Sequence, residues 1–195
     1  MKILLLAGSP SPSSRSARLL HHLGDSLALL GHDLLRLQIA GLPAHALLHA
    51  EIAHPSLRNA REQVDEADAL VIATPVYKAA YSGVLKVFLD LLPQDGLAGK
   101  LVLPLATGGS QSHMLALDYA LRPVLSALSA RHILPSIYAT DAQVTWSPEH
   151  GLSLDPALKQ RLARGVDNLV AGLNALHDAA VEFAPVDFSS VRCSV

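Results

Sequence analysis

The sequence holds one cysteine, few charged residues and few aromatic side chains. A single cysteine, Cys193, cannot build a disulfide framework or a cysteine-based metal site, so we expect a reduced, cytoplasmic compartment. Charged residues make up 16% of the chain and leave a formal net charge of −2, which provides no basic excess for binding nucleic acid or an anionic membrane. No apolar run approaches the roughly 18–20 residues that a membrane-spanning helix needs.

Half of the 195 residues are apolar, and the mean hydropathy is +0.32. Such a composition excludes intrinsic disorder, which requires low hydrophobicity and high net charge. The length favours a single domain with its own core. We predict this domain over residues 1–178 and a C-terminal tail or arm over residues 179–195, where the helical periodicity stops.

Short apolar runs alternate with helical patterns along the chain. Runs without polar alternation are typical of parallel strands that are covered on both faces. Three segments show this clearly and two more weakly: Ile3–Ala7, Ala69–Ala73 and Leu101–Ala106, then His32–Gln38 and Ile133–Ala139. They predict an α/β fold, a flavodoxin-like five-stranded parallel sheet in the order 2-1-3-4-5 with helices on both faces. Ligands of such sheets bind outside the carboxyl ends of the strands, so the loops after strands one, three and four should carry the site.

The first of these loops, Gly8–Ser16, contains five serine hydroxyls and the guanidinium of Arg15, directly before a predicted helix. The unpaired N–H groups and the positive dipole end of a helix N-terminus favour an anion there, so the pattern favours a phosphate site. The loop lacks the glycines of a Walker A or G-x-G-x-x-G motif. An ordinary loop of serines and prolines that caps the helix is the alternative interpretation.

The other two loops have the composition of a site for a planar ligand. Thr74–Gly83 holds two of the chain's four tyrosines, and such neighbours suit a flat heteroaromatic ring. Packing of both tyrosines on the following apolar helix, Val84–Leu92, or at a subunit contact explains them equally well. Thr107–His113 contains Gly108-Gly109, which would let the backbone approach a ring closely but would also fit a plain turn.

A long helical pattern at Ser112–Ala130 has Pro123 well inside it. Proline removes one backbone donor and crowds the carbonyl four residues earlier, which belongs to Tyr119. We therefore predict a break or a π-bulge at Tyr119, with a simple proline kink as the alternative. The predicted core-facing stripe of this helix is Met114, Leu117, Leu121 and Leu128.

The ten histidines do not form a metal-binding pattern. Those at His21-His22, His45, His49 and His54 lack both the H-E-x-x-H spacing and a neighbouring carboxylate cluster. We expect no metal site and interpret them as solvated or capping side chains.

Several stretches resemble one family. Gly8-Ser9-Pro10, Ser14-Arg15-Ser16, Thr74–Gly83, Leu103–Gly109 and His113–Leu128 resemble the NAD(P)H-dependent FMN reductases of bacterial alkanesulfonate utilisation. The resemblance extends from Met1 to about Val144. It implies an oxidoreductase that transfers hydride from NADPH or NADH to N5 of FMN and supplies the reduced FMN to a separate monooxygenase. It also implies a homo-oligomer, a tetramer assembled through the helix that carries Tyr119, with Tyr119 close to the flavin and affecting its exchange.

The resemblance also implies roles for individual residues. The FMN phosphate would be bound by Ser9, Ser14, Arg15 and Ser16. The isoalloxazine would lie along Pro75, Val76 and Tyr77, with Thr107, Gly108 and Gly109 near its polar edge. Lys78 and main-chain N–H groups are the candidates for stabilising negative charge on the reduced ring. No catalytic side chain is expected, because the cofactor carries the hydride chemistry.

Three alternatives remain open at this point. One is a quinone, azo or chromate reductase on the same fold that keeps FMN as a bound prosthetic group. Another is an electron carrier of flavodoxin type, although the chain lacks the glycine-containing loop and the acidic surface of those proteins. The third is a binding module without flavin.

Overall fold

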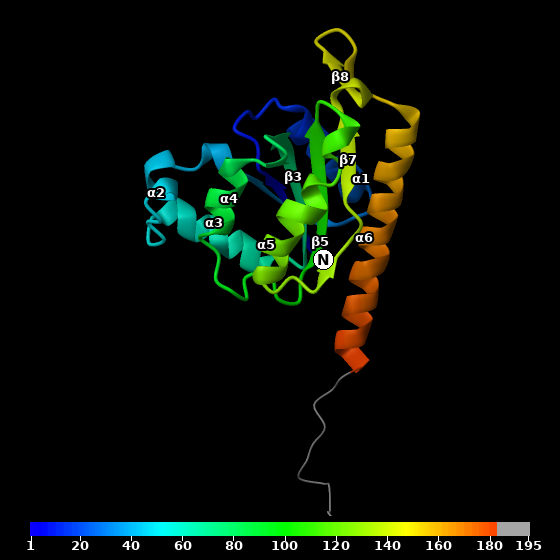
Figure 1. Ribbon diagram of the computed structural model, residues 1–195. Coiled ribbons are helices and arrows are strands. Elements are labelled where there is room, and N and C mark those ends of the chain that lie inside the picture. The colour runs from blue at the N-terminus through cyan, green and yellow to red at the C-terminus, as the bar shows by residue number, and fades with distance from the viewer. Residues whose placement is uncertain (183–195) are drawn as a thin grey trace, which may run out of the picture.

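A mainly parallel sheet forms the centre of the computed structural model, which describes residues 1–182 (Figure 1). The sheet consists of β1 (Lys2–Ala7), β2 (Asp33–Gln38), β3 (Ala69–Tyr77), β5 (Leu101–Gly108), β6 (His132–Ile133) and β7 (Ile137–Thr140), and β4 (Ala80–Tyr81) pairs antiparallel with β3. Its order is β2-β1-β3-β5-β6, and β7 continues along β5 beyond β6. Leaving out β4, this is the predicted 2-1-3-4-5 order with the fifth strand in two pieces. The flavodoxin-like prediction is confirmed.

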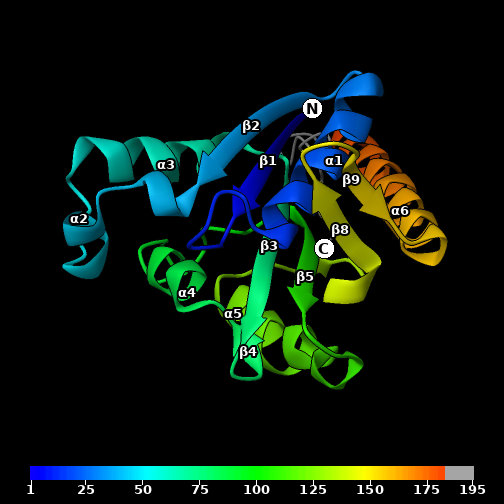
Figure 2. The same ribbon diagram turned by 90° about the horizontal axis from the view of Figure 1, so that it is seen from above.

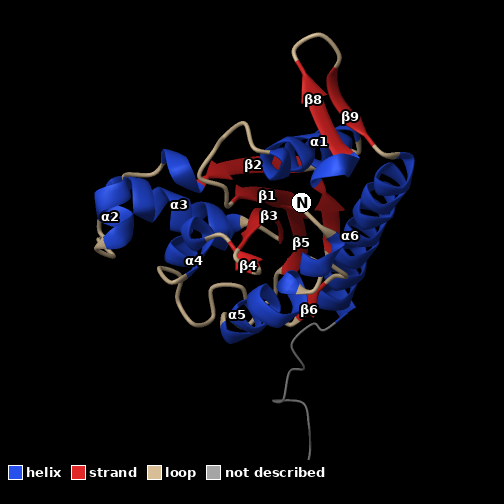
Figure 3. Ribbon diagram, turned by 45° about the horizontal axis from the view of Figure 1, so that its top comes forward, coloured by secondary structure: helices blue, strands red, loops and turns tan. Residues whose placement is uncertain are grey.

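Helices cover both faces of the sheet (Figure 3). One face carries α1 (Arg15–Leu29) and α6 (Pro156–Glu182), and the other carries α2 (Ala44–Leu48), α3 (Pro55–Glu66), α4 (Gly83–Leu89) and α5 (Arg122–Ala127). Along β1, Leu4 and Leu6 enter the second of these cores and Ile3 and Leu5 the first, as the two-residue period of a strand requires. Because both faces are buried, the strand is apolar from Ile3 to Ala7, and only Lys2 at its start is charged.

The two long helices on one face begin at side-chain caps. The Ser14 hydroxyl accepts the Ala17 N–H at the start of α1. The Asp155 carboxylate accepts the N–H groups of Ala157 and Leu158 at the start of α6. Aspartate at the cap and proline at the first helical position both favour a helix start.

The segment predicted as one long helix, Ser112–Ala130, is divided into three parts. A 3₁₀ turn at Gln111–His113 is followed by a π-helix at Leu117–Leu121 and then by α5. The predicted π-type widening at Tyr119 is confirmed. The predicted core position of Met114 is wrong: its side chain is 50% exposed, because the 3₁₀ turn changes the helical phase ahead of the π-helix. Leu117, Leu121 and Leu128 are buried as predicted.

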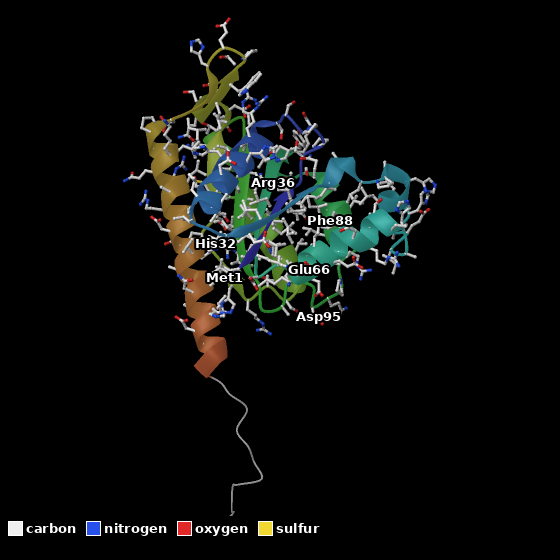
Figure 4. The ribbon with its side chains drawn as sticks, turned by 180° about the vertical axis from the view of Figure 1, so that it is seen from behind. Met1, His32, Arg36, Glu66, Phe88 and Asp95 are labelled. Atoms are coloured by element: carbon white, nitrogen blue, oxygen red, sulfur yellow. The ribbon has the colours of Figure 1, made fainter. Side chains whose placement is uncertain are left out.

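Two further features lie at the ends of the sheet. The antiparallel hairpin of β8 (Val144–Ser147) and β9 (Gly151–Leu154) projects beyond the carboxyl end of the sheet, next to the start of α1 (Figure 1). Met1, Glu66 and Asp95 mark the opposite end, while Phe88 points into the core (Figure 4).

None of the helices described is long and apolar enough to cross a membrane. Helix α6 continues through the predicted domain end at residue 178, and residues 183–195 of the predicted tail lie outside the described part.

Candidate functional site

Strand pairing brings the three predicted loops together at one edge of the sheet (Figure 2). Ala7 pairs with Ala73, and the Gly8 N–H donates to the Ala73 carbonyl at 2.8 Å, so the first loop leaves beside Thr74. Pro75 pairs with Thr107, which places the second loop against the third. The parallel register therefore assembles a single site from segments separated by many residues.

The first loop places hydroxyls around the N-terminus of α1. Ser9 and Ser16 are buried, and the Ser14 and Ser16 hydroxyls lie 3.2 Å apart. The Ser9 hydroxyl accepts the Ser11 N–H at 3.2 Å, and the Gln38 side-chain amide donates to the Ser9 carbonyl. No acidic residue occupies the first turn of α1, so its amides and dipole present a positive end to the loop.

Two buried hydroxyls that the sequence did not single out connect the first loop to the second. Ser82 donates its hydroxyl hydrogen to the Gly8 carbonyl, and its oxygen accepts the Leu85 N–H as the cap of α4. The Thr74 hydroxyl accepts the Ser82 N–H at 3.0 Å and donates to the Pro75 carbonyl. Serine two residues before an apolar helical run is a capping signal, but its long-range partner is visible only in the fold.

The second loop is more regular than predicted, because β3 continues to Tyr77 and turns back at once into β4. Lys78 and Ala79 form the two-residue turn with φ of 49° and 63°, the left-handed pair that a type I′ hairpin requires. Neither residue is glycine, so the turn carries backbone strain of about 1–3 kcal/mol per residue. Pro75 is buried, Val76 is half-buried, and Tyr77 and Lys78 are exposed at the rim.

The third loop is shaped by Tyr138 of β7. The Tyr138 hydroxyl donates to the Ser110 carbonyl at 2.7 Å, and burial raises the pKa of Tyr138, with Asp141 adding to the increase. A Cβ on Gly108 would lie 2.4 Å from that hydroxyl, so a larger residue there would force the Tyr138 side chain to move. Gly109 is different: a Cβ there would meet nothing within 4 Å, so the backbone borders open space at the edge of the site. Thr107 is buried.

Arg15 lies at this edge but is directed toward the segment that follows β7. Its Nε donates to the Val144 carbonyl at 3.2 Å, and its Nη1 lies 3.5 Å from Oδ2 of Asp141. One turn further along α1, the Arg18 guanidinium lies 3.9 Å from the ring centroid of Trp146 on β8. Sequence reasoning missed Asp141 as part of this edge, because the acid lies 126 positions from Arg15, the difference between the two residue numbers.

The π-helix leaves Tyr119 outside the core. Its side chain is 77% exposed, and the neighbouring Met114 and Leu115 are 50% and 49% exposed. A hollow of about 540 Å³ lies next to them, lined among others by Asp118 and Arg122. Met114, Leu115 and Tyr119 thus expose apolar side chains in the segment that follows the third loop.

Within residues 1–182, no group of three or more histidine, cysteine, aspartate or glutamate side chains is placed to hold a metal ion. The donors that do converge are hydroxyls and backbone amides, which suit a phosphate, and the Arg15 guanidinium lies at the same edge on its ion pair with Asp141. Next to them is an open edge lined by glycine backbone and an aromatic rim. Fold and donor set together fit a flavin nucleotide: its phosphate at the start of α1 and its ring along the second and third loops. This is the class of flavodoxin-like flavin-nucleotide proteins.

Comparison with known proteins identifies the family. The model of the NADPH-dependent FMN reductase family matches residues 1–145, and the chain belongs to that family. It is 45% identical over 174 residues to FMN reductase (NADPH) of Escherichia coli (strain K12), covering 89% of this chain and 91% of that protein. It is 33% identical over 175 residues to NADH-dependent FMN reductase SfnF of Pseudomonas putida, covering 88% and 92%. The apo crystal structure of NADH:FMN oxidoreductase (EMOB) superposes with a TM-score of 0.78 at 38% identity, covering 86% of this chain and 87% of that one.

These matches confirm the predicted enzyme class, an NAD(P)H-dependent FMN reductase with FMN and NADPH or NADH as its cofactors. The resemblance noted in the sequence is confirmed with it. The contacts assigned to individual residues remain predictions that rest on the geometry described above.

Proposed function

We propose that this enzyme reduces FMN as an exchangeable substrate and supplies the product to a partner FMNH₂-dependent monooxygenase, in alkanesulfonate desulfonation. The observation that carries the proposal is the open form of the site. Gly109 borders open space and Tyr77 is 52% exposed, whereas the hydroxyls at the start of α1 are partly buried. Such a site would hold the phosphate while leaving the ring accessible, which suits a flavin that must enter and leave.

In this proposal each loop has a separate task. Ser9, Ser14, Arg15 and Ser16 bind the phosphate, and Pro75, Val76 and Tyr77 support the ring. Bound FMN supplies the hydride acceptor, its N5 atom. The chain stabilises the added negative charge with the Lys78 ammonium at the strained turn and with main-chain N–H groups of Thr107, Gly108 and Gly109. The nicotinamide would approach the exposed face of the ring, and hydride transfer would require its C4 to come within roughly 3–3.5 Å of the acceptor atom.

We further propose a homotetramer that forms through the π-helix. Met114, Leu115 and Tyr119 expose apolar surface next to the site, and a second copy of this segment would cover it. Tyr119 would then lie at a subunit contact close to the flavin, where its packing affects flavin exchange. Exposed apolar clusters of this kind mark interaction surfaces in many proteins.

Flavin content and stopped-flow kinetics test the exchange. The purified protein should carry little flavin, show NAD(P)H oxidation that saturates with added FMN, and release FMNH₂ that a monooxygenase can use. Tightly retained FMN with activity toward quinones, azo compounds or chromate would instead support the prosthetic-group alternative. Retained flavin without NAD(P)H oxidation would support an electron carrier. Parallel runs with NADPH and NADH determine the coenzyme preference, and light scattering determines the number of subunits.

A further inference from the structure

The guanidinium of Arg15 has two acceptors outside the phosphate loop. Oδ2 of Asp141 lies 3.5 Å from its Nη1, and the Val144 carbonyl accepts from its Nε at 3.2 Å. Both side chains of the ion pair are about half exposed, at 52% and 46%. The pair is therefore accessible to a ligand at the start of α1, and it is weak enough to exchange partners.

Asp141 is held in place by a network of its own. It is the first residue of a 3₁₀ turn, Asp141–Gln143, in which the Gln143 side chain accepts the Thr140 N–H at 3.1 Å. The Arg161 guanidinium donates hydrogen bonds to the same Gln143 oxygen at 3.1 Å and to the Tyr138 carbonyl at 2.9 Å. These hydrogen bonds fix the backbone of the turn that carries the Asp141 carboxylate, at the carboxyl end of β7. Gly108 at the start of the third loop pairs with Thr140, the residue before the turn, so the turn lies beside that loop.

We infer that Asp141 competes with the FMN phosphate for Arg15 and thereby keeps FMN binding weak and reversible. This inference rests on the proposed function, in which Arg15 binds the phosphate. A two-donor contact to phosphate uses adjacent N–H groups on one edge of the guanidinium. One edge already donates through Nε to the Val144 carbonyl and the other faces Asp141 through Nη1, so a phosphate that takes the second edge displaces Asp141. A phosphate monoester carries about −1.5 to −2 charges near pH 7, so the nearby carboxylate also repels it. Asp141 acts as a residue that sets affinity without contacting the flavin.

The test is the dissociation constant of FMN, measured by flavin fluorescence for the wild type and Asp141→Asn. The variant keeps the shape of the side chain and removes its charge. We expect FMN to bind about three- to tenfold more tightly and to dissociate correspondingly more slowly. Riboflavin, which lacks the phosphate, should change by less than about twofold. Unchanged or weaker FMN binding, or an equal gain for riboflavin, would overturn the inference.

Two further variants distinguish competition for Arg15 from the general effect of removing a negative charge. Asp25→Asn removes the acid of another surface pair, Asp25 on α1 with Arg36 at 3.7 Å, whose side chains are 74% and 48% exposed, and should leave FMN binding unchanged. In an Arg15→Ala background, Asp141→Asn should gain clearly less FMN affinity than in the wild type. An equal gain would mean that Asp141 acts by repulsion alone and would overturn the competition. If the wild type binds no FMN, the proposed function fails; if it binds FMN and Asp141→Asn has no effect, only this inference fails.

Discussion

The Ser82 hydroxyl joins two ends of the site by donating to the Gly8 carbonyl, 74 residues away in the sequence. The same oxygen caps α4 by accepting the Leu85 N–H. Ser82 is 1% exposed, so neither bond competes with water. One side chain therefore holds the first loop against α4, the helix that follows the second loop.

Ser82→Ala should lower the free energy of unfolding by about 2–4 kcal/mol, because it removes a helix cap and leaves a buried carbonyl unpaired. Urea unfolding with an unchanged m-value measures the loss. Ser126→Ala, on the exposed side of α5, is the matched control and should change stability by less than about 0.5 kcal/mol. Equal effects of the two variants would contradict the assigned role of Ser82.

Arg15→Ala should raise the dissociation constant of FMN by about ten- to a hundredfold, because a charge-assisted contact to phosphate is lost. Its ion pair is half exposed, so thermal stability should change little. Riboflavin serves as the control ligand and should lose far less affinity. If both flavins weaken by the same factor, Arg15 does not bind the phosphate.

Gly108 and Gly109 should respond differently to alanine. Gly108→Ala places a methyl group against the Tyr138 hydroxyl and should cost about 1–3 kcal/mol of folding stability. Gly109→Ala has open space and should fold as the wild type does. If the ring lies against Gly109, Gly109→Ala should raise the dissociation constants of FMN and riboflavin by the same factor, roughly tenfold. Unaltered flavin binding in Gly109→Ala would place the ring elsewhere.

Tyr119→Ala should change the oligomeric state or the rate of FMN exchange while leaving the free energy of unfolding within about 0.5 kcal/mol of the wild type. The reason is that Tyr119 is 77% exposed and contributes little to the core of one subunit. Leu48→Ala, at a 72% exposed position on α2, is the matched control and should leave the oligomeric state and the rate of FMN exchange unchanged. Light scattering and stopped-flow flavin release report the result; an unaltered tetramer with unaltered release would exclude this role.

Most of the fold was predictable because its determinants are local. Strands covered on both faces must be apolar throughout, and β1, β3 and β5 appear as such runs in the sequence. The π-helix was predictable for a similar reason, since Pro123 removes a donor at a known spacing from Tyr119. The interruption at Gln111–His113 carries no comparable signal, and Met114 was therefore placed on the wrong face.

The sequence by itself determined the sheet, the helix caps and the loops that form the site, because apolar periodicity and capping act over a few neighbouring residues. Only the tertiary structure decided the partners within that site. The Ser82–Gly8 bond and the contact of Arg15 with Val144 join residues 74 and 129 positions apart. Such pairs arise from strand order and register, which depend on how all the elements pack together. No local pattern encodes them, and for that reason Asp141 emerged only from the folded chain.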